Sequence, residues 1–289
     1  MKNYVMPALI AVIVSLLVYN FLPRSASDVA AKKETAFERV MRTGVLRCGY
    51  YVFPPVTKRD PNTNELSGFA VDLMERISKI TSLKIEWAEE IGFGNWTVGL
   101  QNGRFDAICT PLWPDGGKAR EAFFTRPLFY SAAAAYVRFD DHRFDNDLSK
   151  LNDPNVTMVI MDGNVLNALI EEYFPKVKTF SLPANTDYGT LVQNVTTGKA
   201  DVVLADLNGA MELMRHNPNS IRNPDPTRPI KLMPFEIAVA RGEVELQQLL
   251  DVAVQDQLNL GVVDRLLTKW EQFPGSFYRV AQPFRPTGQ

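Results

Sequence analysis

The chain has 289 residues with 31 basic and 33 acidic side chains, which gives a formal net charge of −2 at neutral pH. Both signs are spread along the chain, and the lack of a basic stripe excludes nucleic acid as an expected partner. Two cysteines, Cys48 and Cys109, are too few for a disulfide scaffold, and no Cys/His spacing resembles a metal site. We therefore expect no metal and no other cofactor.

An apolar run from Tyr4 to Leu22, with basic residues on both sides, opens the chain. Its length is closer to the ~20 residues that span a hydrocarbon core than to the roughly 7 to 15 of a cleavable signal peptide. We expect residues 1–24 to be an uncleaved signal anchor, with a cleaved signal peptide as the alternative, and residues 25–39 to be a polar spacer. Either segment directs the rest of the chain out of the cytoplasm.

Residues 44–109 alternate between strand and helix patterns. A helix opened by Gly68 carries apolar residues along one face from Phe69 to Ile80, so it should pack on a sheet. We predict strands at 44–49, 83–87 and 106–109 and a short helix at 96–101. Together these elements form a β-α-β-α-β half with parallel strands.

The same winding recurs after an apolar crossover segment at Leu128–Val137. The sequence pattern of Gly103–Ile108 is repeated at Gly198–Val203. Both segments have the order Gly, basic, any residue, Asp, small or apolar, β-branched. We predict strands at 156–161, 177–181, 201–205 and 235–240, helices at 164–174, 188–198, 243–259 and 261–272, and a surface excursion at 211–225. The repeat predicts a second, similarly wound lobe.

The expected fold is therefore α/β, with two lobes that are each a doubly wound, mainly parallel sheet with flanking helices. We expect residues 40–135 and 236–289 to form lobe one and residues 136–235 to form lobe two. The first and third strands of a doubly wound half are adjacent, which predicts that Cys48 and Cys109 lie on neighbouring strands. Whether the two cysteines form a disulfide stays open at this point.

Loops at the predicted strand ends carry large rings. Trp113 lies in a loop that follows the strand at 106–109, while Tyr50 and Phe53 lie in the loop that follows the first strand. Open α/β sheets bind ligands at the carboxyl ends of their parallel strands. Stacking or cation–π contact with a ligand would explain why such rings stand in these loops.

The chain resembles the family 3 extracellular solute-binding proteins, the polar amino acid binding components of ABC importers, over residues 44–273. The matching phrases, in order, are Leu46–Tyr50, Leu66–Leu73, Leu100–Asp106, Phe124–Pro127, Gly198–Asp206 and Gly261–Trp270. The resemblance implies a periplasmic-binding-protein-like (type II) clamp that closes on a small molecule between two lobes. It also implies a periplasmic location, an inner-membrane ABC permease as partner and a monomeric state.

The family pattern is altered at the positions that hold the ligand. Lys118 stands where the family has an arginine that grips an α-carboxylate, and Trp113 and Asp115 replace two hydroxyl residues. Lysine is a point charge that cannot reproduce a bidentate fork, which weakens the carboxylate clamp. Asp206 matches the family's acceptor for the ligand amine. We therefore expect the cleft to prefer an amine-bearing or cationic solute.

The ligand-binding residues that we predict are Tyr50, Phe53, Trp113, Asp115, Lys118, Gly163, Asn164 and Asp206. Simpler roles compete with ligand contact: Lys118 as a surface lysine, Asp115 as its pairing partner, and Asp206 as a helix N-cap. Gly163 and Asn164 stand where the resemblance implies Gly-Thr-Thr at a helix N-terminus.

We expect a solute-binding protein for an ABC-type importer and no catalytic residues. One alternative is a sensory binding domain on the same fold, for which a permanent anchor would be natural. Another is an enzyme, because the family resembles the cyclohexadienyl dehydratases, and Glu89 and Glu90 are then the candidate general acids. Fold alone does not choose among these functions, and the identity of the ligand stays open.

Overall fold

The computed structural model describes Ser15, residues 34–92 and residues 96–280. Apart from Ser15, the predicted N-terminal anchor lies outside these residues, as does most of the predicted spacer. Within the described ranges, no helix is both long and apolar enough to cross a membrane. Residues 1–35 and 36–289 form separate compact units, and the fold below is that of the second unit.

The helices and strands follow the predicted order closely. The helices are α2 (Ala36–Thr43), α3 (Phe69–Thr81), α4 (Trp96–Gln101), α5 (Leu166–Tyr173), α6 (Tyr188–Thr196), α7 (Leu207–His216), α8 (Val244–Asn259) and α9 (Val262–Trp270), with 3₁₀ turns η1 (Lys118–Arg120) and η2 (Leu148–Leu151). The strands are β1 (Val45–Tyr50), β2 (Lys58–Arg59), β3 (Leu66–Ser67), β4 (Lys84–Glu90), β5 (Ala107–Leu112), β6 (Ala122–Phe124), β7 (Phe129–Arg138), β8 (Thr157–Met161), β9 (Lys178–Leu182), β10 (Val202–Asp206), β11 (Ile221–Arg222), β12 (Lys231–Ala240) and β13 (Phe277–Arg279).

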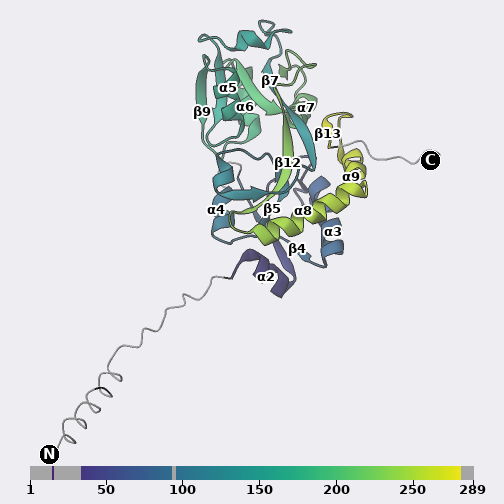
Figure 1. Ribbon diagram of the computed structural model, residues 1–289. Coiled ribbons are helices and arrows are strands. Elements are labelled where there is room, and N and C mark those ends of the chain that lie inside the picture. The colour runs from purple at the N-terminus through teal and green to yellow at the C-terminus, as the bar shows by residue number, and fades with distance from the viewer. Residues whose placement is uncertain (1–14, 16–33, 93–95, 281–289) are drawn as a thin grey trace, which may run out of the picture. The chain divides into compact units, whose positions relative to one another are not determined.

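The sheet contains two groups of parallel strands. One group has the order β4-β1-β5 and the other has the order β10-β8-β9. Antiparallel strands β7 and β12 join them, and the two long strands run alongside each other in Figure 1. We call the part built on β4, β1, β5 and β6 lobe one and the part built on β10, β8 and β9 lobe two. The predicted α/β class with parallel strands is confirmed.

Strand β12 is shared by both lobes. It pairs with β7 through Phe235 and with β5 from Glu236 onward, so backbone pairing passes without a break from one group to the other. The residue bounds given above for the lobes stay a prediction.

Helix α3 packs in lobe one as its periodicity predicts. Phe69, Leu73 and Ile77 are fully buried, and α3 contacts α8 and α9, which lie beside it in Figure 1. The expectation for the end of the face is wrong, because Ile80 is 47% exposed while Met74 is buried instead. Ile80 falls on the same helical face by its spacing, but it is the penultimate residue of α3, at the end of the apolar stripe.

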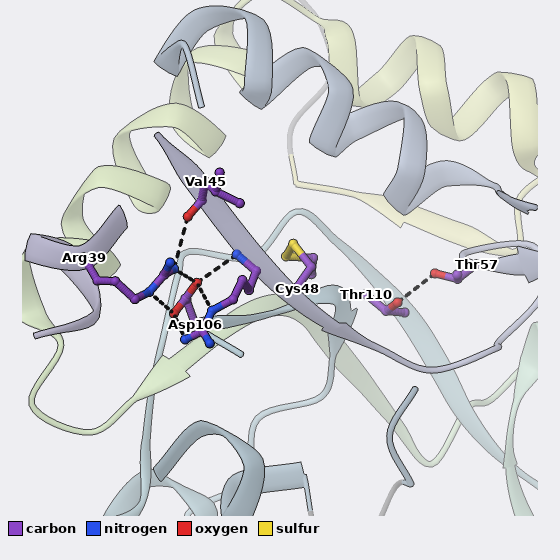
Figure 2. The surroundings of a disulfide bond; sticks show 8 residues. Arg39, Val45, Cys48, Thr57, Asp106 and Thr110 are labelled. Atoms are coloured by element: carbon purple, nitrogen blue, oxygen red, sulfur yellow. Dashed lines mark hydrogen bonds and ion pairs between the residues drawn. A yellow bond between two sulfur atoms is a disulfide. The ribbon is translucent and has the colours of Figure 1, made fainter. Parts of the chain in front are cut away.

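A disulfide joins Cys48 on β1 to Cys109 on β5, with Cα atoms 5.4 Å apart (Figure 2). The prediction that the two cysteines lie on neighbouring strands is confirmed, and the open question of bonding is answered. Asp106, just before β5, accepts hydrogen bonds from Arg39 of α2 and from the guanidinium and backbone N–H of Arg47. These links fix β5, whose carboxyl end leads directly to Trp113.

Candidate ligand-binding cleft

A cavity of about 380 Å³ is lined by residues of both lobes. Lobe one supplies the loops that follow β1 and β5, and lobe two supplies the starts of α5, α6 and α7. The volume is at the lower end of the range for small-molecule sites. The lining residues are Tyr51, Val52, Phe53, Pro54, Trp96, Leu112, Trp113, Asp115, Lys118, Met161, Gly163, Asn164, Val165, Leu166, Thr186, Asp187, Tyr188, Asp206, Gly209, Glu212, Leu213 and Phe235.

Seven of the eight predicted site residues line this cavity, and Tyr50 does not. The ring of Tyr50 packs edge-on against Trp87, with centroids 5.8 Å apart, while the adjacent Tyr51 faces the cavity. Glu89 and Glu90, the candidate acids of the enzyme alternative, are not lining residues either. They form ion pairs with Arg104 and Arg59.

Aromatic rings build one wall of the cavity. Phe235, in the shared strand β12, stacks on Phe53 at 6.2 Å and meets Trp113 edge-on at 5.6 Å. The Nε1 atom of Trp113 is buried and has no hydrogen-bond partner among the described residues. These rings line the cavity, and aromatic rings are groups that bind cations.

Asp206 ends β10 and caps α7. Its carboxylate accepts the backbone N–H groups of Asn208 at 2.8 Å and Gly209 at 3.2 Å, and it accepts the hydroxyl of Ser131. The residue is only 7% exposed, and burial raises the pKa of its carboxyl from 3.8 to about 6, although these hydrogen bonds oppose the shift. The N-cap role that competed with ligand contact is therefore present, and the same carboxylate lines the cavity.

Asp115 and Lys118 face the cavity from lobe one. The carboxylate of Asp115 accepts the backbone N–H of Lys118 at 2.8 Å, at the start of η1. The expected pairing of these residues thus occurs through the backbone amide. Arg120, which follows in the same turn, is not one of the lining residues.

Gly163 and Asn164 precede α5 and line the cavity as predicted. Gly163 has a φ of 73°, a left-handed conformation that glycine adopts without strain. The side-chain oxygen of Asn164 accepts the N–H of Leu166, the first residue of α5, at 2.9 Å. The donors at this helix start are therefore taken up in part by the chain itself.

The sequence interpretation missed two acidic residues in the lining. Asp187 is the N-cap of α6, where its carboxylate accepts the N–H of Thr190 at 2.9 Å. Hydrogen bonds from Thr190 lower the pKa of Asp187, so it stays ionised. An Asp just before an apolar helical repeat is a recognisable N-cap signal, and this one could have been found.

Glu212 was missed because residues 211–225 were expected to be a surface excursion. That expectation is wrong for its first part, since α7 continues to His216. Glu212 and Leu213 follow Asp206 and Gly209 along the face of α7 that lines the cavity. Glu212 also forms an ion pair with Arg215 at 2.6 Å.

The sequence profile of a family described as bacterial extracellular solute-binding proteins, family 3, matches residues 46–273. A Campylobacter jejuni protein described as a probable histidine-binding protein is 25% identical over 158 residues, which are 55% of this chain and 59% of that protein. The chain thus spans about three fifths of the length of that relative. The amino-acid-binding protein AabA of Dichelobacter nodosus is 25% identical over 211 residues, which are 71% of this chain and 79% of AabA.

Solved structures share the fold. The crystal structure of an ancestral amino acid-binding protein, a precursor of cyclohexadienyl dehydratase, matches with a TM-score of 0.68 at 21% identity. The match covers 82% of this chain and 99% of that chain. The match confirms the predicted two-lobed architecture. At 21% sequence identity it shows the fold alone.

Proposed function

Because this chain belongs to the bacterial extracellular solute-binding proteins of family 3, we propose that it captures a small amine-bearing, amino-acid-like solute between its lobes and delivers it to an ABC-type importer. It works as a monomer in the periplasm. The apolar run Tyr4–Leu22 tethers it to the inner membrane, beside the permease that receives the solute.

The observation that carries this proposal is the position of Asp206. A buried carboxylate that lines a cavity favours a positive partner there, because its hydrogen bonds offset only part of the cost of desolvation. Its pKa of about 6 leaves it largely ionised at neutral pH, and a ligand ammonium would lower that pKa further. The residue therefore suits an acceptor for a ligand amine.

The remaining contacts come from both lobes, which is what a closing clamp requires. On lobe one, Phe53 and Trp113 stack on the ligand, and Asp115 and Lys118 border its polar end. On lobe two, Gly163 and Asn164 approach it with backbone and amide groups. Tyr51, Asp187 and Tyr188 complete the set.

An enzymatic role is the second candidate, and one observation favours it. Asp206 is an acid with a raised pKa in a cavity, a combination that also suits a general acid. A dehydratase would release water from its ligand, whereas a binding protein returns it unchanged. Mass spectrometry of the ligand after incubation with the protein separates these functions.

The proposed function is tested by native mass spectrometry of the purified full-length protein, followed by calorimetric titration with amines and amino acids. We expect a copurifying amine-bearing molecule that binds with one-to-one stoichiometry. Tight binding of a sugar, or of an acid without an amine, would contradict the proposal. Loss of radiolabelled ligand uptake in a deletion strain distinguishes transport from sensing.

A further inference from the structure

Three helices of lobe two begin at the cavity, and each has a first-turn N–H occupied by a side chain of the chain itself. Asn164 accepts the N–H of Leu166 in α5, Asp187 accepts that of Thr190 in α6, and Asp206 accepts those of Asn208 and Gly209 in α7. The residues named as acceptors all line the cavity.

A helix start that faces a cavity is a place where a ligand carboxylate can bind. Free N–H groups and the positive end of the helix dipole make a helix N-terminus a ready anion site. Here Asp187 and Asp206 already place carboxylates at two of the three starts. An anionic ligand group would meet occupied donors and a like charge at those two positions, and an occupied donor at the third.

The charges of the lining residues also favour a cationic ligand over an anionic one. Among the described lining residues the acids are Asp115, Asp187, Asp206 and Glu212, and Lys118 is the sole basic side chain. None of these described residues is an arginine, so a planar bidentate partner for a carboxylate is missing from the lining. Lobe two contributes three of the acids and no described lining cation, and of these three acids Glu212 is paired with Arg215, which lies outside the lining.

Aromatic rings supply the complementary surface. Phe53, Trp113 and Phe235 pack together, from lobe one and the shared strand, and line the same cavity as the acidic helix starts of lobe two. An organic cation gains attraction from ring faces and from carboxylates at once, whereas a carboxylate gains from neither.

We propose that the cleft is built for an organic cation without a carboxylate, a primary amine or diamine, rather than for a zwitterionic amino acid. This inference rests on the proposed function and narrows it to one ligand class. At each of the three helix starts, a side chain of the protein already occupies a first-turn N–H that could otherwise bind a carboxylate.

The test uses matched compounds that differ by one group. Lysine is compared with 1,5-diaminopentane, and phenylalanine with phenethylamine, by calorimetric titration of the full-length protein. A third arm uses 3-phenylpropionate, which keeps the carboxylate and lacks the amine. We expect the amine of at least one pair to bind at least about tenfold tighter than its amino acid, a difference of ~1.4 kcal/mol, and 3-phenylpropionate not to bind.

The outcomes separate this inference from the function on which it rests. If the amino acid of each pair binds as tightly as its amine, the inference is overturned and the amine-binding function stands. If 3-phenylpropionate binds best, or if no amine and no amino acid binds, both are overturned.

Two variants guard against an indirect effect. Asp187→Asn keeps a side-chain acceptor for the N–H of Thr190 but removes the charge from the cavity. We expect it to weaken amine binding at least about threefold, the scale of a partly screened charge, and to leave the fold intact by circular dichroism. Asp147→Asn makes the same change at the N-cap of η2, outside the cavity lining, and should leave affinity unchanged. If both variants bind the amine as tightly as the wild type, the charge of Asp187 does not contribute to binding and the inference from the acidic lining is contradicted.

Discussion

The hydroxyl of Ser131, in strand β7, donates a hydrogen bond to the carboxylate of Asp206, at the start of α7. Ser131 lies in the part of β7 that pairs with β12, the strand shared by both lobes. The carboxylate proposed to hold the ligand amine is therefore tied to the segment that joins the lobes. Ligand binding and lobe closure can influence each other through this contact.

Replacing Asp206 by Asn should weaken binding of an amine ligand by about 2 to 5 kcal/mol, because a buried charge-assisted hydrogen bond becomes a neutral one. Asparagine still accepts the N–H groups of α7, so the helix cap survives. Calorimetric titration measures the affinity, and thermal unfolding checks the fold. An affinity equal to that of the wild type would mean that Asp206 serves as a cap and nothing more.

The affinity for an amine should fall as the pH drops below about 6. Burial raises the pKa of Asp206 to about 6, so below that pH protonation removes the negative charge that the ammonium needs. Linkage predicts a loss of about tenfold per pH unit on the acid side. Titrations between pH 4.5 and 8 measure this slope, and the Asp206→Asn variant should show little of it. A flat wild-type profile would show that this carboxylate does not bind the ligand.

Glu236→Gln should stabilise the protein at pH 8 and have a smaller effect at pH 5. Burial, followed by the nearby charge of Asp251, raises the pKa of Glu236 from 4.5 to about 7. Between these two values the folded state binds more protons than the unfolded state, so the unfolding free energy falls as the pH rises. Glutamine does not titrate, so the variant does not lose unfolding free energy at this position as the pH rises.

Thermal unfolding at the two pH values measures the effect of Glu236→Gln. The exposed Glu172→Gln variant on α5 is the control, with a Tm close to that of the wild type at both. A Tm gain for Glu236→Gln that is equal at pH 5 and pH 8 would contradict the linkage.

Removal of the disulfide should lower the unfolding free energy by roughly 4 kcal/mol. Cys48 and Cys109 are 61 residues apart, and a cross-link over such a loop restricts the unfolded chain by about that amount. Both cysteines are fully buried, so conservative Cys→Ala replacement of the pair tests the bond with little change at the surface. Chemical denaturation of the variant against the oxidised wild type gives the difference, and identical midpoints would speak against a formed bond.

The sequence determined the order and type of the main elements, because apolar periodicity reports which face of a segment is buried. The strands at 44–49, 106–109 and 201–205 and the helix from Phe69 were all predictable in this way. Loops after parallel strands lie at one edge of a sheet, which placed Phe53 and Trp113 at the cleft. The family resemblance, and not local geometry, indicated Asp115, Lys118, Gly163, Asn164 and Asp206.

Only the tertiary structure decided which neighbouring residue faces the ligand. Tyr50 was chosen and Tyr51 lines the cavity, because side chains alternate along a strand and a loop at its end can present either one. The folding of the chain also joined Cys48 to Cys109 and brought Asp187, Asp206 and Glu212 to one acidic wall. These residues are separated in sequence, and their proximity depends on how strands and helices pack, which local patterns do not encode.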